Sequence, residues 1–198
     1  MAPASIRIGL VRLTDMAPAF VAEAKGFFAA EGIAATLSVE PSWANIADKL
    51  TYRALDAAIM LAPLAFAVAA GLRGGAATPL LVPLAVSQNG NALTVRPSLA
   101  DALGPETGDA AVLGQRLAAY IAGGERLRIA VVHAYSSHDL LLRHWLAASG
   151  IDPVDQVDLV VVPPADMVEA LRAGTIDGFC VGAPWARSRP APASAAQS

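Results

Sequence analysis

Side chains at three places in the chain can supply hydrogen-bond donors to an anion. His138 opens an expected helix, where free backbone N–H groups and the helix dipole favour negative charge. Trp43 opens another expected helix, and its indole N–H only donates. Asn89 and Asn91 flank Gly90 in a turn-forming segment. A histidine bonded to its own turn, a packed tryptophan and an ordinary turn explain the same spacing, so the residues alone leave both interpretations open.

The same region offers little for nucleophilic or nucleotide chemistry. Ser137, His138 and Asp139 have the residue types of a hydrolase triad, but adjacent residues do not generally form a nucleophile–base–orienter line, and no GxSxG occurs. The first expected strand is followed by LTD rather than by GxGxxG, and no GxxxxGK[ST] is present. We therefore expect a protein that is not an enzyme.

Metal and redox sites are also disfavoured. His133, His138 and His144 are not spaced like the paired histidines of an HExxH helix. Cys180 is the only cysteine, which excludes an intrachain disulfide and a zinc site with several cysteines. It stands in an apolar strand and is expected to be a small buried core residue. No metal and no cofactor are expected.

Composition indicates an ordinary globular chain. Of 198 residues, 55% are hydrophobic and 16% charged, and 14 basic against 17 acidic residues give a net charge of −3. These values exclude a disordered chain, a highly charged coiled coil and a basic nucleic-acid arm, so direct nucleic-acid binding is not expected.

The longest apolar run, Leu55 to Leu72, contains Asp56 and Pro63 and is expected to be a buried strand and helix rather than a membrane span. The N-terminus lacks a basic segment followed by an apolar stretch, and apolar residues alternate from Ile6 to Leu10 as in a strand. As written, the chain is expected to be cytoplasmic. It would be periplasmic if a leader was removed.

Strands and helices alternate along the chain, which predicts an α/β fold of parallel sheets with helices on both faces. Asp15, Ser42 and Ser136 or Ser137 are the expected helix caps. The lobe boundary is expected near residues 87–91. The expected strands are 5–12, 33–39, 55–61, 80–86, 93–95, 127–134, 157–162 and 176–181.

Several long segments together resemble the nitrate- and bicarbonate-binding proteins of ABC transporters. The resemblance extends over residues 5–185, opening with IRIGLVRLTDMAPAFVAEAKGFFAAEGI. The other segments are SWANIADKL, LDAAIMLAPLAF, NGNALTV, SSHDLLLRHWLAASGIDP and VVVPPADMVEALRAGTIDGFCVGAPW. It implies a two-lobe, type II periplasmic-binding-protein fold, with lobe I in residues 1–87, lobe II in 88–183 and a disordered tail in 184–198.

The resemblance also implies binding residues in the cleft between the lobes. Trp43 matches a cleft tryptophan, His138 matches a histidine that contacts the anion, and Asn91 stands where nitrate binders usually have glutamine. The shorter amide leaves the anion open. The residues expected to line the cleft beside them are Thr14, Asn89, Ser136 and Ser137.

Two departures from the family pattern bear on these expectations. The GEPW of the family is GAPW here, with Ala183 in place of glutamate. Family members are about twice as long, and their later part completes the first lobe and supplies a lysine ligand. The first lobe is therefore expected to be incomplete and to expose apolar surface. We expect a truncated product or fragment with poor or absent anion affinity.

The resemblance implies a solute-binding protein for nitrate, nitrite or bicarbonate that serves an ABC permease. The absent leader favours an alternative, a cytoplasmic nitrate/nitrite sensor that holds an antiterminator protein. A third possibility is an enzyme like the pyrimidine synthases of thiamine biosynthesis, but these use a cysteine-rich motif and this chain has one cysteine.

Overall fold

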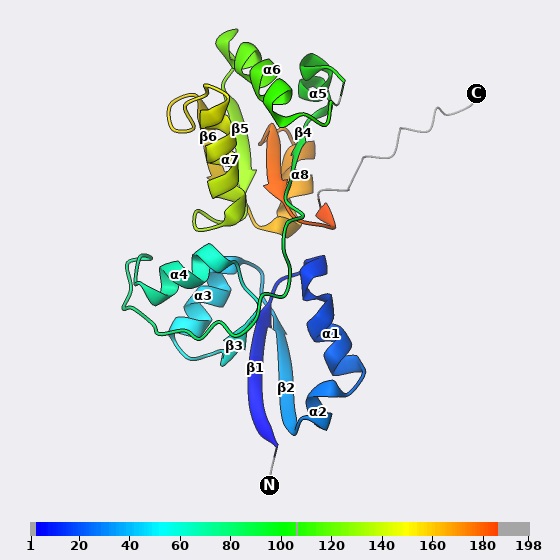
Figure 1. The fold of residues 1–198 in the computed structure, drawn as a ribbon, viewed down its shortest axis with the longest axis vertical. Coiled ribbons are helices and arrows are strands. Elements are labelled where there is room, and N and C mark those ends of the chain that lie inside the picture. The colour runs from blue at the N-terminus through cyan, green and yellow to red at the C-terminus, as the bar shows by residue number, and fades with distance from the viewer. Residues whose placement is uncertain (1–2, 106, 186–198) are drawn as a thin grey trace, which may run out of the picture.

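The computed structural model describes residues 3–105 and 107–185 and consists of two α/β lobes stacked end to end (Figure 1). The elements of lobe I are β1 (Ala4–Leu10), a 3-10 turn (Thr14–Met16), α1 (Ala17–Ala24), α2 (Phe27–Ala30), β2 (Ile33–Val39), α3 (Trp43–Thr51), β3 (Ala57–Ala58) and α4 (Ala62–Ala69). The elements of lobe II are β4 (Ala92–Val95), α5 (Pro97–Leu103), α6 (Ala110–Ala122), β5 (Leu127–Val131), α7 (Ser137–Ala148), β6 (Val157–Val161), a 3-10 turn (Pro164–Asp166), α8 (Met167–Arg172) and β7 (Gly178–Val181).

The sheet of lobe I is parallel, with the order β2-β1-β3. Pairing of β1 with β2 runs from Ala4 opposite Ile33 to Leu10 opposite Val39. The connections from β1 to β2 and from β2 to β3 run in opposite directions across the sheet. Because such crossovers are right-handed, α1 and α2 cover one face and α3 covers the other, as predicted.

The sheet of lobe II has the order β4-β7-β5-β6, and it corrects the expectation of purely parallel pairing. The strands β6, β5 and β7 are parallel, whereas β4 pairs with β7 in the antiparallel sense, Ala92 opposite Val181. The chain enters lobe II through β4 without a preceding crossover helix, so nothing requires this edge strand to be parallel.

Alternation along the strands divides the core into two clusters. On β5, Leu127 and Ile129 face a cluster closed by α5, α6 and α7, together with Cys180 of β7. The neighbouring Ala130 and Phe179 face a second cluster that continues across the lobe boundary into lobe I. Successive side chains of a strand point to opposite faces of the sheet. One face of the lobe II sheet therefore packs on α5, α6 and α7, and the other face packs in the cluster that reaches lobe I. Burial of Cys180, which is 7% exposed, confirms the expected core position.

Two expected strands of lobe I are not formed as predicted. Of residues 55–61, only Ala57–Ala58 pair, with β1. Residues 80–86 are strand-like in sequence, but they form no strand. Leu81, Val82 and Leu84 are 89%, 65% and 72% exposed, which meets the expectation of exposed apolar surface on this lobe. Strand formation needs a neighbouring strand, and the sheet ends at β3.

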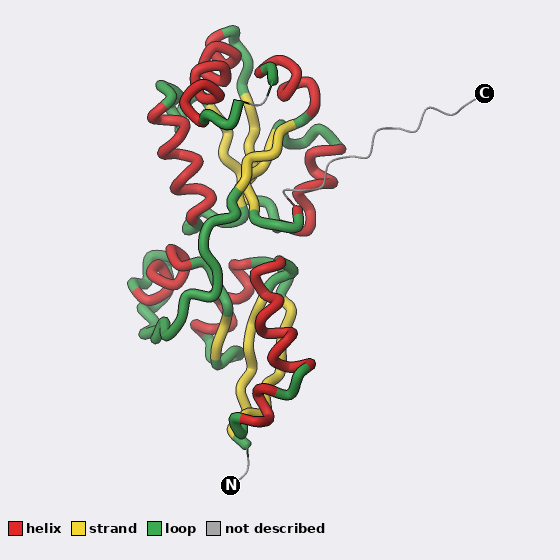
Figure 2. Tube along the Cα trace, turned by 45° about the vertical axis from the view of Figure 1, so that its right-hand side comes forward, coloured by secondary structure: helices red, strands yellow, loops and turns green. Residues whose placement is uncertain are grey.

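The lobes meet at the carboxyl ends of their parallel strands, and one extended segment runs between them (Figure 2). This connecting segment leads from α4 to β4 and contains Asn89 and Gly90, both with positive φ. The segment that follows β7 also contacts lobe I, because the Ala183 carbonyl accepts a hydrogen bond from the Thr14 N–H at 3.2 Å. The expected tail lies outside the described residues from 186 onward. Trp185, assigned to that tail, instead donates its indole N–H to the Arg12 carbonyl at 3.2 Å.

The close approach of β4 and β7 at Gly178 predicts that a larger residue there lowers the free energy of unfolding. A Cβ on Gly178 would lie 2.9 Å from the Thr94 carbonyl oxygen and 3.1 Å from Val95, so Gly178→Ala forces two paired strands apart. We expect a loss of about 1–3 kcal/mol in the free energy of unfolding, measured by urea titration. The matched control is Gly75→Ala, because nothing lies within 4 Å of the added methyl group there. Equal stability of the two variants would contradict the prediction.

Among residues 3–105 and 107–185, no helix is both long and apolar enough to cross a bilayer.

Candidate anion-binding site

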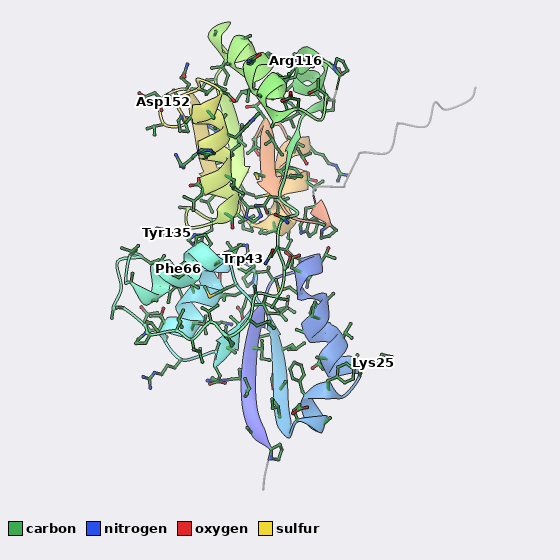
Figure 3. All side chains as sticks on the ribbon, viewed as in Figure 1. Lys25, Trp43, Phe66, Arg116, Tyr135 and Asp152 are labelled. Carbon is green, nitrogen blue, oxygen red and sulfur yellow. The ribbon has the colours of Figure 1, made fainter. Side chains whose placement is uncertain are left out.

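Trp43 is the first residue of α3 and lies at the edge of lobe I that faces lobe II (Figure 3). The helix begins there because Ser42 caps it, with the Ser42 Oγ accepting the Asn45 N–H at 3.2 Å, as predicted. Trp43 is 2% exposed and its Nε1 has no hydrogen-bond partner among the described residues. A buried N–H without an acceptor is unfavourable, so the Trp43 indole N–H can donate a hydrogen bond to a ligand bound at this position.

His138 is placed in the same way from lobe II. It is the second residue of α7, which Ser136 caps by accepting the Asp139 N–H at 3.1 Å. His138 is 5% exposed, and its Nδ1 makes no hydrogen bond within the described part of the chain. Burial lowers the pKa of His138 from 6.5 to about 4, and the Asp15 carboxylate opposes this shift only partly. The imidazole is therefore neutral at pH 7.

Asp15 has a role that the sequence interpretation missed. It does not cap α1 but lies in the preceding 3-10 turn, and its Oδ1 accepts the Ser87 hydroxyl at 2.9 Å. Asp15 Oδ2 also lies 4.0 Å from the position of a Cβ on Gly182. The turn after β1 therefore contacts both the connecting segment and the segment that follows β7, and it places a negative charge near His138. The signal in the sequence was the carboxylate of Asp15 in the short turn that follows the first strand.

Most of the other predicted site residues are more exposed to solvent than Trp43 and His138. Asn91 precedes β4 on the connecting segment and is half-buried, whereas Asn89 is exposed in the turn. The Thr14 side chain is exposed, and Ser137 is half-buried in the first turn of α7. Of the predicted residues, the structure thus buries Trp43, Ser136 and His138 and leaves the others partly or fully accessible.

Asp139 is a further buried polar residue beside His138. One carboxylate oxygen, Oδ2, accepts from the Arg143 Nε at 2.8 Å, one helical turn along α7. The other, Oδ1, has no partner among the described residues, although Asp139 is only 4% exposed. Asp139 stands three residues after the Ser136 cap, where an acidic residue is typical of the first turn of a helix. This position gave no sign that the side chain would be buried.

A groove of about 490 Å³ also lies between the lobes. It runs from the ends of β1 and β2 and the start of α3 to residues 163–166 of lobe II, and Ser42 and Asn45 line it. Trp43, Asn91 and His138 do not line it. The two buried donors are therefore closed off from this groove in the present arrangement of the lobes.

Two further observations concern the buried thiol and the side chains of the types that bind metals. Burial raises the pKa of the Cys180 thiol to about 11, which keeps it protonated and unreactive at pH 7. No three His, Cys, Asp or Glu side chains of residues 3–105 and 107–185 gather as metal ligands.

Two α/β lobes that meet at the carboxyl ends of their strands, with the order β2-β1-β3 in lobe I, give this chain a periplasmic-binding-protein fold of type II. The solved structure of the periplasmic nitrate-binding protein NrtA from Synechocystis PCC 6803 has this fold in common with the chain, with a TM-score of 0.82 and 30% identity. The match covers 92% of this chain and 48% of that structure.

The chain belongs to the NMT1-like family, whose model matches residues 1–189. It is 42% identical over 182 residues to the bicarbonate transport ATP-binding protein CmpC of Synechococcus elongatus, covering 91% of the chain and 27% of CmpC. It is 36% identical over 189 residues to the nitrate/nitrite binding protein NrtA of the same species, covering 91% of the chain and 42% of NrtA. The chain thus spans less than half the length of these relatives. The predicted resemblance to nitrate-binding proteins is confirmed.

Proposed function

We propose that this chain binds a small oxyanion, namely nitrate, nitrite or bicarbonate, at the boundary between its lobes. One observation carries the proposal: Trp43 Nε1 from lobe I and His138 Nδ1 from lobe II are both buried and both lack a hydrogen-bond partner within the described residues. A small anion offers acceptor oxygens on several sides, and only protein donors offset the loss of its hydration.

The proposed contacts divide between the lobes. Trp43 donates from lobe I, His138 donates from lobe II, and the Asn91 amide donates from the segment that connects them. Because Trp43 and His138 are 2% and 5% exposed, the anion enters when the lobes part and is enclosed when they meet. Bound anion then favours the closed arrangement by its differential affinity for that state.

The names of the relatives support this ligand class. NrtA is a nitrate/nitrite binding protein, and CmpC is a component of bicarbonate transport. The ATP binding in the name of CmpC is not part of the proposal, because the chain has no GxxxxGK[ST] motif. The proposed partner is the permease of an ABC importer. The alternative of a sensor that holds an antiterminator protein is distinguished by which of the two copurifies with the tagged chain.

Calorimetric titration with sodium nitrate, sodium nitrite and sodium bicarbonate tests the proposal, with sodium chloride as the control for ionic strength. Saturable heat with one of the three oxyanions supports it and names the anion. Absence of saturable heat with all three would overturn it and favour the prediction of a non-binding product.

A further inference from the structure

A hydrogen bond between Tyr135 of lobe II and the chain after α4 of lobe I also joins the two lobes. The Tyr135 hydroxyl, from the loop between β5 and α7, donates to the Leu72 carbonyl in the turn after α4 at 2.9 Å. Figure 3 shows Tyr135 directly above Phe66 of α4. This hydrogen bond can form only while the lobes are together.

The position of Tyr135 depends on His133. The Tyr135 backbone N–H donates to the His133 Nδ1 at 2.9 Å, and the two ring centroids are 6.0 Å apart. Nδ1 must therefore keep its lone pair, which fixes the neutral imidazole with its proton on Nε2. A proton added to Nδ1 removes the acceptor that orders the loop.

Lobe I also presents charge to His133. Arg73 directly follows Leu72, pairs with Asp48 of α3 at 2.8 Å and is 21% exposed. Burial lowers the pKa of His133, the Arg73 charge lowers it further, and Asp48 acts in the opposite direction. Arg73 and Asp48 are the charged groups of lobe I that act on this imidazole.

We propose that His133 and Tyr135 form a pH-sensitive latch that holds the two lobes together. While His133 is neutral, the latch orders Tyr135 against Leu72. Protonation of Nδ1 breaks the hydrogen bond from the Tyr135 N–H and sets an imidazolium beside Arg73. The inference concerns lobe closure and does not depend on which ligand the chain binds.

The direction of the pH effect follows from the lowered pKa of His133. The unlatched form, with an ordinary histidine, takes up the proton first, so the latch is fully formed above pH 6.5. It weakens as the pH falls below 6.5 towards the lower pKa of the latched form. The lobes therefore separate more readily in acid.

Pulsed electron–electron resonance distances between spin labels test the latch without any anion. Labels at Phe66→Cys and Leu140→Cys, which are 72% and 55% exposed, report the gap from α4 to α7, while Cys180 is buried. We expect a short distance at pH 8 and a several-fold larger population of long distances at pH 5. Tyr135→Phe removes one hydrogen bond and raises the open-to-closed ratio roughly two- to tenfold at pH 8.

Two histidine variants separate the latch from general acid effects. The amide oxygen of His133→Asn stands in the place of Nδ1 and accepts the Tyr135 N–H at any pH. This variant should therefore open less at pH 5 than the unsubstituted chain. His144→Gln, at an exposed position on α7, should open like the unsubstituted chain. Identical distances at both pH values in the unsubstituted chain, or opening of His133→Asn to the same extent, would overturn the proposal.

Discussion

Trp43→Phe is expected to weaken anion binding by roughly 10- to 100-fold, because a hydrogen bond to a charged group contributes about 1.5–3 kcal/mol. The phenyl ring keeps most of the packing at this 2% exposed position and removes the Nε1–H donor. Calorimetric titration with the oxyanion that the unsubstituted chain binds measures the change in Kd.

Stability separates loss of a ligand contact from loss of the fold. The Trp43 Nε1 has no partner among the described residues, so its removal breaks no hydrogen bond of that part of the chain. The smaller ring leaves a cavity at this buried position, so the urea midpoint of Trp43→Phe should fall through lost packing alone. Trp145→Phe is the matched control, because the Trp145 indole donates to the Ala110 carbonyl at 2.8 Å inside lobe II. It should also lower the urea midpoint but leave Kd unchanged. An equal loss of affinity in the two variants would refute the assignment.

The second large effect is a loss of stability in acid that depends on His138. The pKa of this imidazole is about 4 in the folded chain against an ordinary value of 6.5, so the unfolded chain takes up the proton first. The free energy of unfolding therefore falls as the pH drops from 6.5 to 4 and is not lowered further by this group below 4. The gap corresponds to roughly 3 kcal/mol.

Urea unfolding curves at pH 7.5, 5.5 and 4.5 test this prediction by comparison between variants. His138→Gln cannot be protonated and should lose about 2.5 kcal/mol less than the unsubstituted chain between pH 7.5 and 4.5. His144→Gln, at an exposed position on the same helix, should keep the full dependence. Carboxylates and His133 add their own pH dependence to every variant, so only the difference between variants is informative. A full acid loss in His138→Gln would exclude this imidazole as the cause.

Local chemistry was sufficient to predict the helix starts that carry the candidate site. Ser42 and Ser136 cap α3 and α7 through the N–H groups of residues three positions ahead, Asn45 and Asp139. Such a bond depends on neighbours within one turn, so sequence spacing alone predicts it. The positions of Trp43 and His138 in the first turns of their helices followed from this reasoning.

Contacts between distant parts of the chain could not be predicted in this way. Asp15 has the residue type of a cap, but its carboxylate instead accepts from Ser87, 72 positions along the chain. Residues 80–86 have the composition of a strand and lack a paired neighbour. The antiparallel pairing of β4 with β7 depends on how the chain enters lobe II.

The sequence by itself determined the alternation of strands and helices, the two serine caps and the apolar core position of Cys180. These features depend on period, capping chemistry and side-chain polarity within a few residues. Only the tertiary structure decided that Trp43 Nε1 and His138 Nδ1 are both buried without partners among the described residues, and that Tyr135 reaches Leu72. Burial and lobe contact depend on groups far away in the chain, and the pKa of His138 changes only when those groups remove water from it.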